Sequence, residues 1–281
     1  MKKYISLLLS VLFLIPLFCS HAGAKELKDM KVVVYGDSIS AAGKWEEWFE
    51  GHTGVHVINK GVGGDSTRTA KIRLGEVLGL KPDVVFIEFG TNDSAIDMDK
   101  YTELSAFKQN LRDFIDAFEK AGARVILITP PPVDDEKYLT RHKAAPFEPY
   151  GGPNGLVTIY AQAVREVAAE KHVVLADVHA DFNALDNYKN YLSDGVHPTT
   201  DGYSKYTWTC INTWRRMWRG DINIDGSVNA KDYLLVKRAV LKTYTLTAPE
   251  LERADVNVDE KLDAKDYLLL KRAALGTYTI K

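Results

Sequence analysis

The chain has 281 residues, 46% of them hydrophobic, so it can bury one full core and still supply a second small domain. A formal net charge of -2 provides no strongly basic surface, and this argues against a nucleic-acid or anionic-lipid partner. We therefore expect a folded protein that binds neither nucleic acid nor a membrane.

The first 24 residues have the pattern of a secretory signal. Lys2 and Lys3 precede an apolar run over 5–18, and Ala22 to Ala24 form a small-residue cleavage site. The run is shorter than the roughly 20 apolar residues that a membrane-spanning helix needs. We expect segment 1–24 to be removed and the mature protein to be secreted.

Short apolar runs alternate with helical patterns from residue 31 to about 218. Five runs lack internal proline and glycine and have the length of strands, at 31–35, 55–59, 83–89, 124–129 and 173–178. A helix is predicted over 104–121, where apolar residues follow the 3.6-residue period up to Gly122. This alternation predicts an α/β fold with a parallel sheet covered on both faces.

An internal repeat follows this region. The segment GDINIDGSVNAKDYLLVKRAVL at 220–241 returns as ADVNVDEKLDAKDYLLLKRAAL at 254–275, and each copy combines an acidic loop with a helix. We therefore predict a signal peptide at 1–24, a first domain at 25–218 and a second domain at 219–281.

Several polar residues lie after the predicted strands, at the sheet edge where α/β proteins bind ligands. Ser38 follows the first strand, a glycine-rich loop at 59–67 follows the second, and Asn92 follows the third. Asp194 precedes His197 by three residues, so one loop can carry a base and the carboxylate that orients it. Each feature alone also fits a helix cap, a turn or a surface histidine. Their combination favours nucleophilic catalysis.

Four sequence blocks, in this order, resemble those of the SGNH or GDSL hydrolases across residues 31–218: GDSI (36–39), NKGVGGDST (59–67), GTND (90–93) and DGVHP (194–198). The resemblance implies a flavodoxin-like three-layer fold and ester hydrolysis through an acyl-enzyme without a catalytic cofactor. By position it makes Ser38 the nucleophile and a backbone oxyanion donor, with Gly64 and Asn92 as further donors. His197 becomes the general base and Asp194 its orienting partner. The pair His179 and Asp181 is a rival without this sequence context.

Each repeat contains a 12-residue loop with oxygen-bearing residues at alternating positions, as a calcium ion requires. The predicted ligands are Asp221, Asn223, Asp225, Ser227, Asn229 and Asp232 in the first loop and Asp255, Asn257, Asp259, Lys261, Asp263 and Asp266 in the second. Ser227 and Lys261 would contribute backbone carbonyls. A solvated acidic turn is the alternative, but its duplication in register favours two structural Ca²⁺ ions. In the second loop, Glu260 occupies the turn position that Gly226 has in the first. This replacement would cost about 1 kcal/mol if the φ of Glu260 is positive.

Both loops have Asp at position 12 and a helix only after the loop, and in this they resemble a type I-like dockerin over 220–281. The resemblance implies a small all-α calcium-binding module that binds a cohesin domain of a scaffoldin. The residues implied at the cohesin contact are Ala230, Lys231, Lys237 and Arg238, repeated as Ala264, Lys265, Lys271 and Arg272. Because the repeats are nearly identical, two alternative binding modes are expected.

An esterase joined to a dockerin implies an extracellular, cellulosome-bound enzyme that deacetylates plant cell-wall polysaccharides such as acetylated xylan. A lysophospholipase or thioesterase and a non-catalytic carbohydrate-binding relative are the alternatives. The loop over 130–155 is expected to contribute to the substrate surface. Trp45 or Trp48 could stack on a sugar or pack in the core. The sugar, the acyl group, the cohesin class and the oligomeric state stay open.

Overall fold

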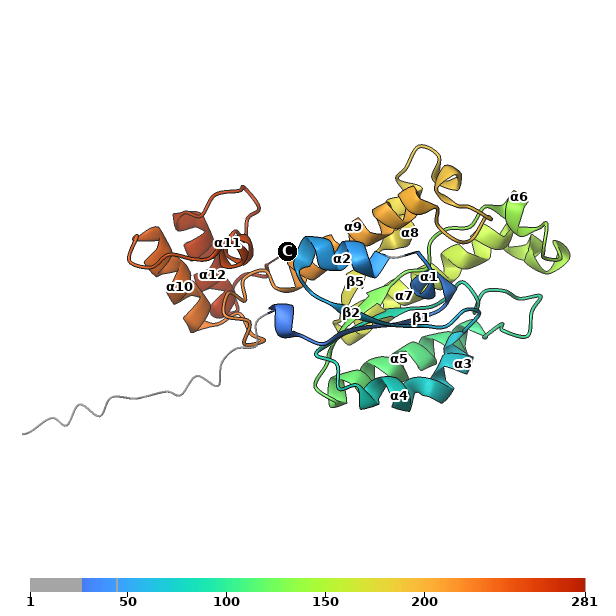
Figure 1. Ribbon diagram of the computed structural model, residues 1–281, viewed down its shortest axis with the longest axis horizontal. Helices are drawn as coiled ribbons and strands as arrows, with labels where there is room; N and C mark the ends of the chain where they lie inside the picture. Colours follow the sequence, from blue (N-terminus) through green and yellow to red (C-terminus); the bar gives the residue numbers. More distant parts are fainter. Residues whose placement is uncertain (1–26, 44, 281) are drawn as a thin grey trace, which may run out of the picture.

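The computed structural model describes residues 27–43 and 45–280, so the predicted signal segment lies outside the described residues. Five parallel strands form one sheet in the order β2-β1-β3-β4-β5 (Figure 1). They are β1 (Val32–Gly36), β2 (Val57–Gly61), β3 (Val84–Glu88), β4 (Arg124–Ile128) and β5 (Val174–Ala176). This order is the flavodoxin-like arrangement, and it confirms the predicted α/β fold.

Both faces of the sheet are buried under helices, and side chains that alternate along each strand contribute to the two cores in turn. Val33 and Tyr35 belong to one hydrophobic core, and Val32 and Val34 belong to the other. The first core is covered by α3 (Thr67–Ala70), α4 (Leu74–Gly79), α5 (Leu104–Lys120) and α7 (Pro153–Lys171). The second is covered by α1 (Ser38–Ala41), α2 (Trp45–Thr53), α8 (Val178–Asn183) and α9 (Thr200–Met217). Figure 1 shows α4 and α5 on one side of the sheet and α2 and α9 on the other.

Short elements complete the connections. They are α6 (Asp135–Tyr138) and the 3₁₀ helices η1 (Leu27–Asp29), η2 (Lys71–Arg73), η3 (Ala145–Tyr150) and η4 (Tyr188–Tyr191). Within the described ranges, no helix combines the length and the apolar character that crossing a membrane requires.

All five strands differ from their predicted bounds by at least one residue, and the second and fifth differ most. β2 begins two residues late and includes Lys60 and Gly61, because these residues pair with Tyr35 and Gly36 of β1. A side chain at position 61 would not fit, since its Cβ would lie 2.4 Å from the backbone nitrogen of Ala41. β5 ends early because Asp177 caps α8 by accepting a hydrogen bond from Ala180.

The C-terminal repeat folds around its own small core. Its helices are α10 (Ala230–Val240), α11 (Ala248–Ala254) and α12 (Ala264–Ala274), and its core contains Ile222, Val236, Leu246, Ala254, Val256 and Leu270. The expectation of a helix only after each loop is wrong for the second loop. There α11 ends directly before Asp255, and it forms because Thr247 and Glu250 make a capping box. Glu260 takes a positive φ of 61°, which is the condition under which replacing the turn glycine has a cost.

The two folded regions are in direct contact. The Arg124 guanidinium lies 4.3 Å from the centre of the Trp218 ring, and its Nη2 atom is 3.5 Å from Asp221 Oδ2 in the first acidic loop. Arg215 Nε is 2.9 Å from Glu252 Oε1 of α11. The chain therefore enters the repeat through a packed junction at Trp218.

Candidate active site

Ser38, His197 and Asp194 meet at the carboxyl edge of the sheet. His197 Nε2 is 2.9 Å from Ser38 Oγ, across 159 residues of sequence. On the other side of the ring, His197 Nδ1 is 2.9 Å from Asp194 Oδ2. A hydroxyl, an imidazole and a carboxylate in this chain of contacts can generate a nucleophilic serine.

The turn that presents Ser38 is built by its two preceding residues. Asp37 caps α1, because its Oδ1 atom accepts a 2.8 Å hydrogen bond from the Ile39 backbone. A side chain on Gly36 would collide with Ser40, whose Oγ would lie 2.2 Å from the added Cβ. Ser38 is the first residue of α1, so its backbone N–H has no acceptor within the helix. This N–H can therefore donate to a substrate.

The loop carrying the base is held by the Asp194 side chain. Its Oδ1 atom accepts hydrogen bonds from the backbone of Val196 at 3.0 Å and of His197 at 2.8 Å. Burial alone would raise the pKa of Asp194, but the bonds from His197 and Val196 outweigh it and lower the pKa to about 2. Asp194 therefore stays ionised at any ordinary pH, as a group that orients imidazole and stabilises imidazolium must.

Gly64 and Asn92 line the same cavity as Ser38. Asn92 Nδ2 donates to the Asp65 carbonyl at 2.9 Å and to Asp37 Oδ2 at 3.1 Å, while its Oδ1 atom accepts from Lys100 Nζ at 3.3 Å. An amide nitrogen has two hydrogens, so donation to an oxyanion would replace one of these bonds. The amide nitrogen already faces the loops that carry Ser38 and Gly64.

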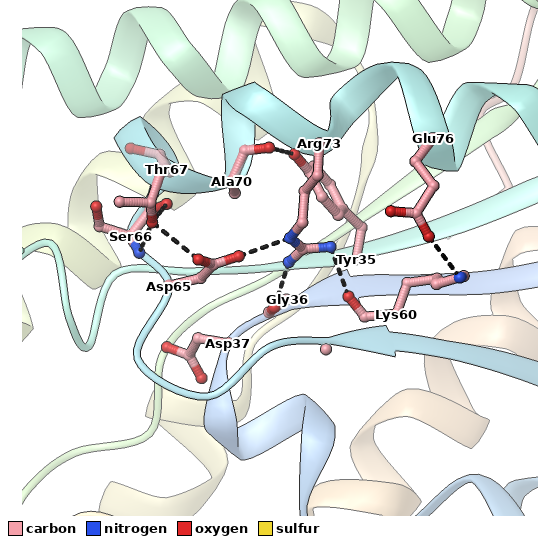
Figure 2. Close-up of polar contacts among 12 residues, drawn as sticks. Tyr35, Gly36, Asp37, Lys60, Asp65, Ser66, Thr67, Ala70, Arg73 and Glu76 are labelled. Atoms are coloured by element: carbon pink, nitrogen blue, oxygen red, sulfur yellow. Dashed lines mark hydrogen bonds and ion pairs between the residues drawn. The ribbon is translucent and has the colours of Figure 1, made fainter.

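Arg73 ties these loops together, a role that the sequence did not suggest (Figure 2). Its guanidinium donates to the Gly36 carbonyl at 2.9 Å and to the Lys60 carbonyl at 2.7 Å, at the ends of β1 and β2. Its Nε atom is 2.6 Å from Asp65 Oδ2, and the guanidinium lies over the Tyr35 ring. Both charged side chains are mostly buried, at 17% and 13% exposure. Arg73 therefore fixes the loop of Gly64 relative to the turn of Ser38.

Three carboxyl groups are fully buried near the site: Asp37, Glu88 and Asp93. Burial raises the pKa of Asp37 and of Glu88, and the two groups interact with each other. Burial also raises the pKa of Asp93 to about 6, despite hydrogen bonds from Thr67. These acids connect the strand ends through hydrogen bonds, as Glu88 does by accepting from Ser40 Oγ at 3.0 Å.

The cavity has a volume of about 430 Å³, which is enough for a small ligand. Tyr138, Arg141 and His142 contribute to its wall, so part of the predicted loop over 130–155 does line the site. Trp45 is completely buried in the core, and Trp48 is not among the residues lining the cavity. The sugar-stacking role considered for a tryptophan thus has no support at this cavity.

The rival histidine has a structural role. His179 is 2% exposed, with Nδ1 3.1 Å from the Pro130 carbonyl and Nε2 3.2 Å from Thr158 Oγ1. Asp181 instead accepts from Thr209. His142, which from sequence is a less favoured candidate for the base because it lacks the Asp-x-x-His context, lines the cavity. Lys100 and Arg141 were missed because no local motif marks them; both lie in loops.

Comparison with known proteins agrees with this geometry. Residues 34–205 match the model of the GDSL-like lipase/acylhydrolase family. The chain belongs to this family. Residues 219–275 match the dockerin type I domain, so the C-terminal repeat is a dockerin.

Individual relatives of this GDSL-like hydrolase cover most of the first domain. The uncharacterized lipoprotein YqeF of Bacillus subtilis is 31% identical over 223 residues, or 72% of this chain and 85% of the relative. An acetylxylan esterase of Geobacillus stearothermophilus is 28% identical over 160 residues, which cover 53% of this chain and 68% of the relative. The crystal structure of a lipase/acylhydrolase from Enterococcus faecalis aligns with a TM-score of 0.56 and 28% identity, covering 65% of this chain and 94% of that one.

The first dockerin loop has the donor set that a calcium ion prefers. Carboxylate oxygens of Asp221, Asp225 and Asp232 lie within 4.8 Å of one another. Burial and then the neighbouring Asp232 raise the pKa of Asp221, so a bound cation would relieve this repulsion. The residues present therefore fit a hard divalent cation.

The second loop repeats this arrangement of hydrogen bonds. Asp266 Oδ1 accepts from Val256 at 3.1 Å, as Asp232 Oδ1 accepts from Ile222 at 2.8 Å. Asp259 donates its backbone N–H to Asp255, as Asp225 does to Asp221. The two loops thus share these hydrogen bonds from the backbone although Glu260 stands in the second loop where the first has Gly226.

We predict that Asn92→Ala lowers kcat for ester hydrolysis about 100- to 1,000-fold with a smaller change in KM, because one oxyanion donor is lost. Steady-state kinetics measure the effect, and circular dichroism checks the fold. Asn187→Ala is the control, since the exposed Asn187 side chain caps nothing. An Asn92→Ala enzyme with full kcat would exclude the amide as a donor.

We predict that Arg73→Met lowers kcat at least about 10-fold and lowers the melting temperature, because Asp65 loses its buried partner and the loop of Gly64 is released. Arg73→Lys should keep part of the melting temperature that Arg73→Met loses, but it should recover a smaller share of kcat. A lysine cannot reach three acceptors in a fixed plane. The nearby exposed pair Lys60–Glu76 supplies the control Glu76→Gln, which should change neither quantity appreciably. Wild-type kcat in Arg73→Met would contradict the positioning role.

Proposed function

We propose that this protein is a secreted serine esterase that removes acetyl groups from plant cell-wall polysaccharides, such as acetylated xylan, while docked to a scaffoldin. The observation that carries the catalytic part is the contact of His197 Nε2 with Ser38 Oγ at 2.9 Å, in line with Asp194. We also propose that the esterase domain spans residues 25–218 and the dockerin residues 219–281.

In the first half of the reaction, Ser38 Oγ attacks the ester carbonyl carbon while His197 Nε2 takes the hydroxyl proton. The carbonyl becomes an oxyanion, which accepts hydrogen bonds from the backbone of Ser38 and Gly64 and from Asn92 Nδ2. Its collapse breaks the bond to the alcohol, and His197 returns its proton to the leaving oxygen. The acyl group is then bound to Ser38.

In the second half, His197 takes a proton from water, and the resulting hydroxide attacks the acyl-enzyme. Collapse of the second oxyanion breaks the acyl bond to Ser38 Oγ and releases the acid, and His197 Nε2 returns its proton to Oγ, which restores the Ser38 hydroxyl. Asp194 balances the charge of the imidazolium in both halves, because its low pKa keeps it ionised. No step requires a metal or an organic cofactor.

The choice of substrate rests on two observations. The relative that is 28% identical over 160 residues is an acetylxylan esterase, and the dockerin match supports attachment of the enzyme to a polysaccharide-degrading assembly. A lysophospholipase or thioesterase would use the same residues, and a preference for long acyl chains would reveal it. A carbohydrate-binding relative without activity would not need the Ser38–His197–Asp194 contacts, so their presence disfavours this alternative.

The dockerin would hold one structural Ca²⁺ ion in each loop and bind a cohesin domain. Side-chain oxygens of Asp221, Asp225 and Asp232 would hold the first ion, and Asp255, Asp259 and Asp266 would hold the second. The predicted cohesin contacts include Lys231 and Lys265, whose side chains are 67% and 72% exposed. Exposed leucines occupy matching positions on α10 and α12, at Leu234 and Leu268. Such paired surfaces suit two alternative orientations of one partner.

We predict that the intact protein releases acetate from acetylated xylan and that Ser38→Ala releases none above background. Acetate is measured after incubation with a panel of acetylated polysaccharides, and long-chain acyl esters are tested in parallel. Faster turnover of the long-chain esters would favour the lipase or thioesterase alternative. Absence of turnover for every ester would favour the non-catalytic relative.

We predict that Lys231→Ala and Lys265→Ala each retain cohesin binding, whereas the double variant loses at least about 10-fold in affinity, because either repeat can supply the contact. Calorimetry with a matching cohesin in calcium buffer measures the affinity, and removal of calcium by chelation should abolish it. Loss of binding in Lys231→Ala alone would show that a single mode operates.

A further inference from the structure

Positive charge is concentrated in the active-site cavity, although the whole chain has a net charge of -2. Lys100 and Arg141 line the cavity, against a single lining carboxylate, Asp194. His142 also lines it and brings its own counter-charge, because its Nδ1 atom is 2.8 Å from Asp97 Oδ1. A cleft whose walls carry an excess of one sign of charge attracts ligands of the opposite sign.

The two cations retain capacity to bind a ligand. Lys100 Nζ contacts a neutral acceptor, the Asn92 amide oxygen, at 3.3 Å. Arg141 Nη1 is 3.4 Å from Asp194 Oδ2, which is longer than the roughly 2.7–2.9 Å of a strong charge-assisted bond. That same oxygen already accepts from His197 at 2.9 Å. Arg73 is different, since each of its three nitrogens donates to a protein acceptor.

The position of Arg141 indicates which part of a substrate it would meet. Its guanidinium and the His197 ring share the Asp194 carboxylate, and His197 is the group that gives its proton to the leaving alcohol. Arg141 therefore lies on the alcohol side of the scissile bond. Its side chain is 45% exposed, so it can reach a group on a neighbouring sugar. The cavity of about 430 Å³ also has far more room than an acetyl group fills.

Building on the proposed esterase function, we propose that this cavity selects esters whose alcohol part carries a carboxylate. The substrate class is an acetylated glycan in which a uronic acid adjoins the acetylated sugar. Arg141 donates to the uronate oxygens, a geometry that suits the planar guanidinium. Lys100 adds a positive field next to Gly64 and Asn92, because its ammonium lies 3.2 Å from where a side chain on Gly64 would begin. The enzyme thus recognises acidic glycans although the protein is acidic overall.

The test compares three oligosaccharide esters with the same neutral backbone. One is acetylated and uncharged, one is acetylated beside a glucuronic acid, and one has an uncharged sugar part with a succinyl group, which carries a carboxylate on the acyl side, in place of acetyl. We expect kcat/KM for the uronate ester to exceed that of the neutral acetate about 10-fold or more, as a charge-assisted contact allows. The preference should shrink in about 0.5 M salt, since salt screens exposed charges.

The variants Arg141→Gln and Lys100→Gln should each reduce the ratio of kcat/KM for the uronate and neutral acetates, with the larger loss in Arg141→Gln. The ratio is the readout because Arg141 contacts Asp194 and Lys100 contacts Asn92, so a general loss of activity cancels. Lys205→Gln is the control of equal charge, since the exposed Lys205 of α9 does not line the cavity. Binding of the deacetylated acidic and neutral oligosaccharides to Ser38→Ala provides a measurement that does not depend on turnover.

Equal kcat/KM for the uronate and neutral acetates, with no salt effect and equal binding to Ser38→Ala, would overturn this inference and leave the esterase proposal intact. Preference for the succinyl ester over the uronate ester would overturn the assignment of the carboxylate to the alcohol part. Failure to hydrolyse any of the three would instead refute the proposed function, on which the inference rests.

Discussion

The site depends on a hydrogen bond between Ser38 Oγ and His197 Nε2, two groups separated by 159 residues. A contact of this kind forms only if the segments that carry the two residues reach the same place. The parallel sheet ensures this, because all its strands end at one edge and their following loops converge there. The packing that holds the sheet together therefore also helps to set the distance between Ser38 and His197.

Buried polar groups hold the loops at that edge in register. Arg73 joins the ends of β1 and β2 to Asp65, and Asn92 joins Asp65 to Asp37. Because a buried charge or amide without a partner is costly, these bonds penalise any displacement of one loop alone. The proposed oxyanion donors and the proposed nucleophile are thus parts of one hydrogen-bonded network. Such preorganisation is what lets fixed dipoles stabilise a developing charge.

The dockerin follows another physical rule, since each repeat is too small to form a core alone. Val236 of α10 and Leu270 of α12 are equivalent residues, and both are completely buried in the one shared core. The acidic loops lie outside this core, where oxygen ligands can gather around a cation. At the junction, Arg124 of the sheet approaches Asp221 of the first loop, whereas equivalent loop residue Asp255 lies next to α11. The two loops are therefore alike in sequence but placed in different surroundings.

The sequence by itself determined the elements with strong local signals. The positions of Ser38 and Asn92 shortly after strands, the Asp194–His197 spacing and the duplicated acidic loops could all be predicted, because each depends on residues close together in the chain. Tertiary structure decided what depends on distant partners: the length of β2, which its pairing with β1 sets, and the place of Trp45 in the core. It also decided the roles of Arg73, Lys100 and Arg141, which come from separate segments and acquire a function only through the groups that the fold places beside them.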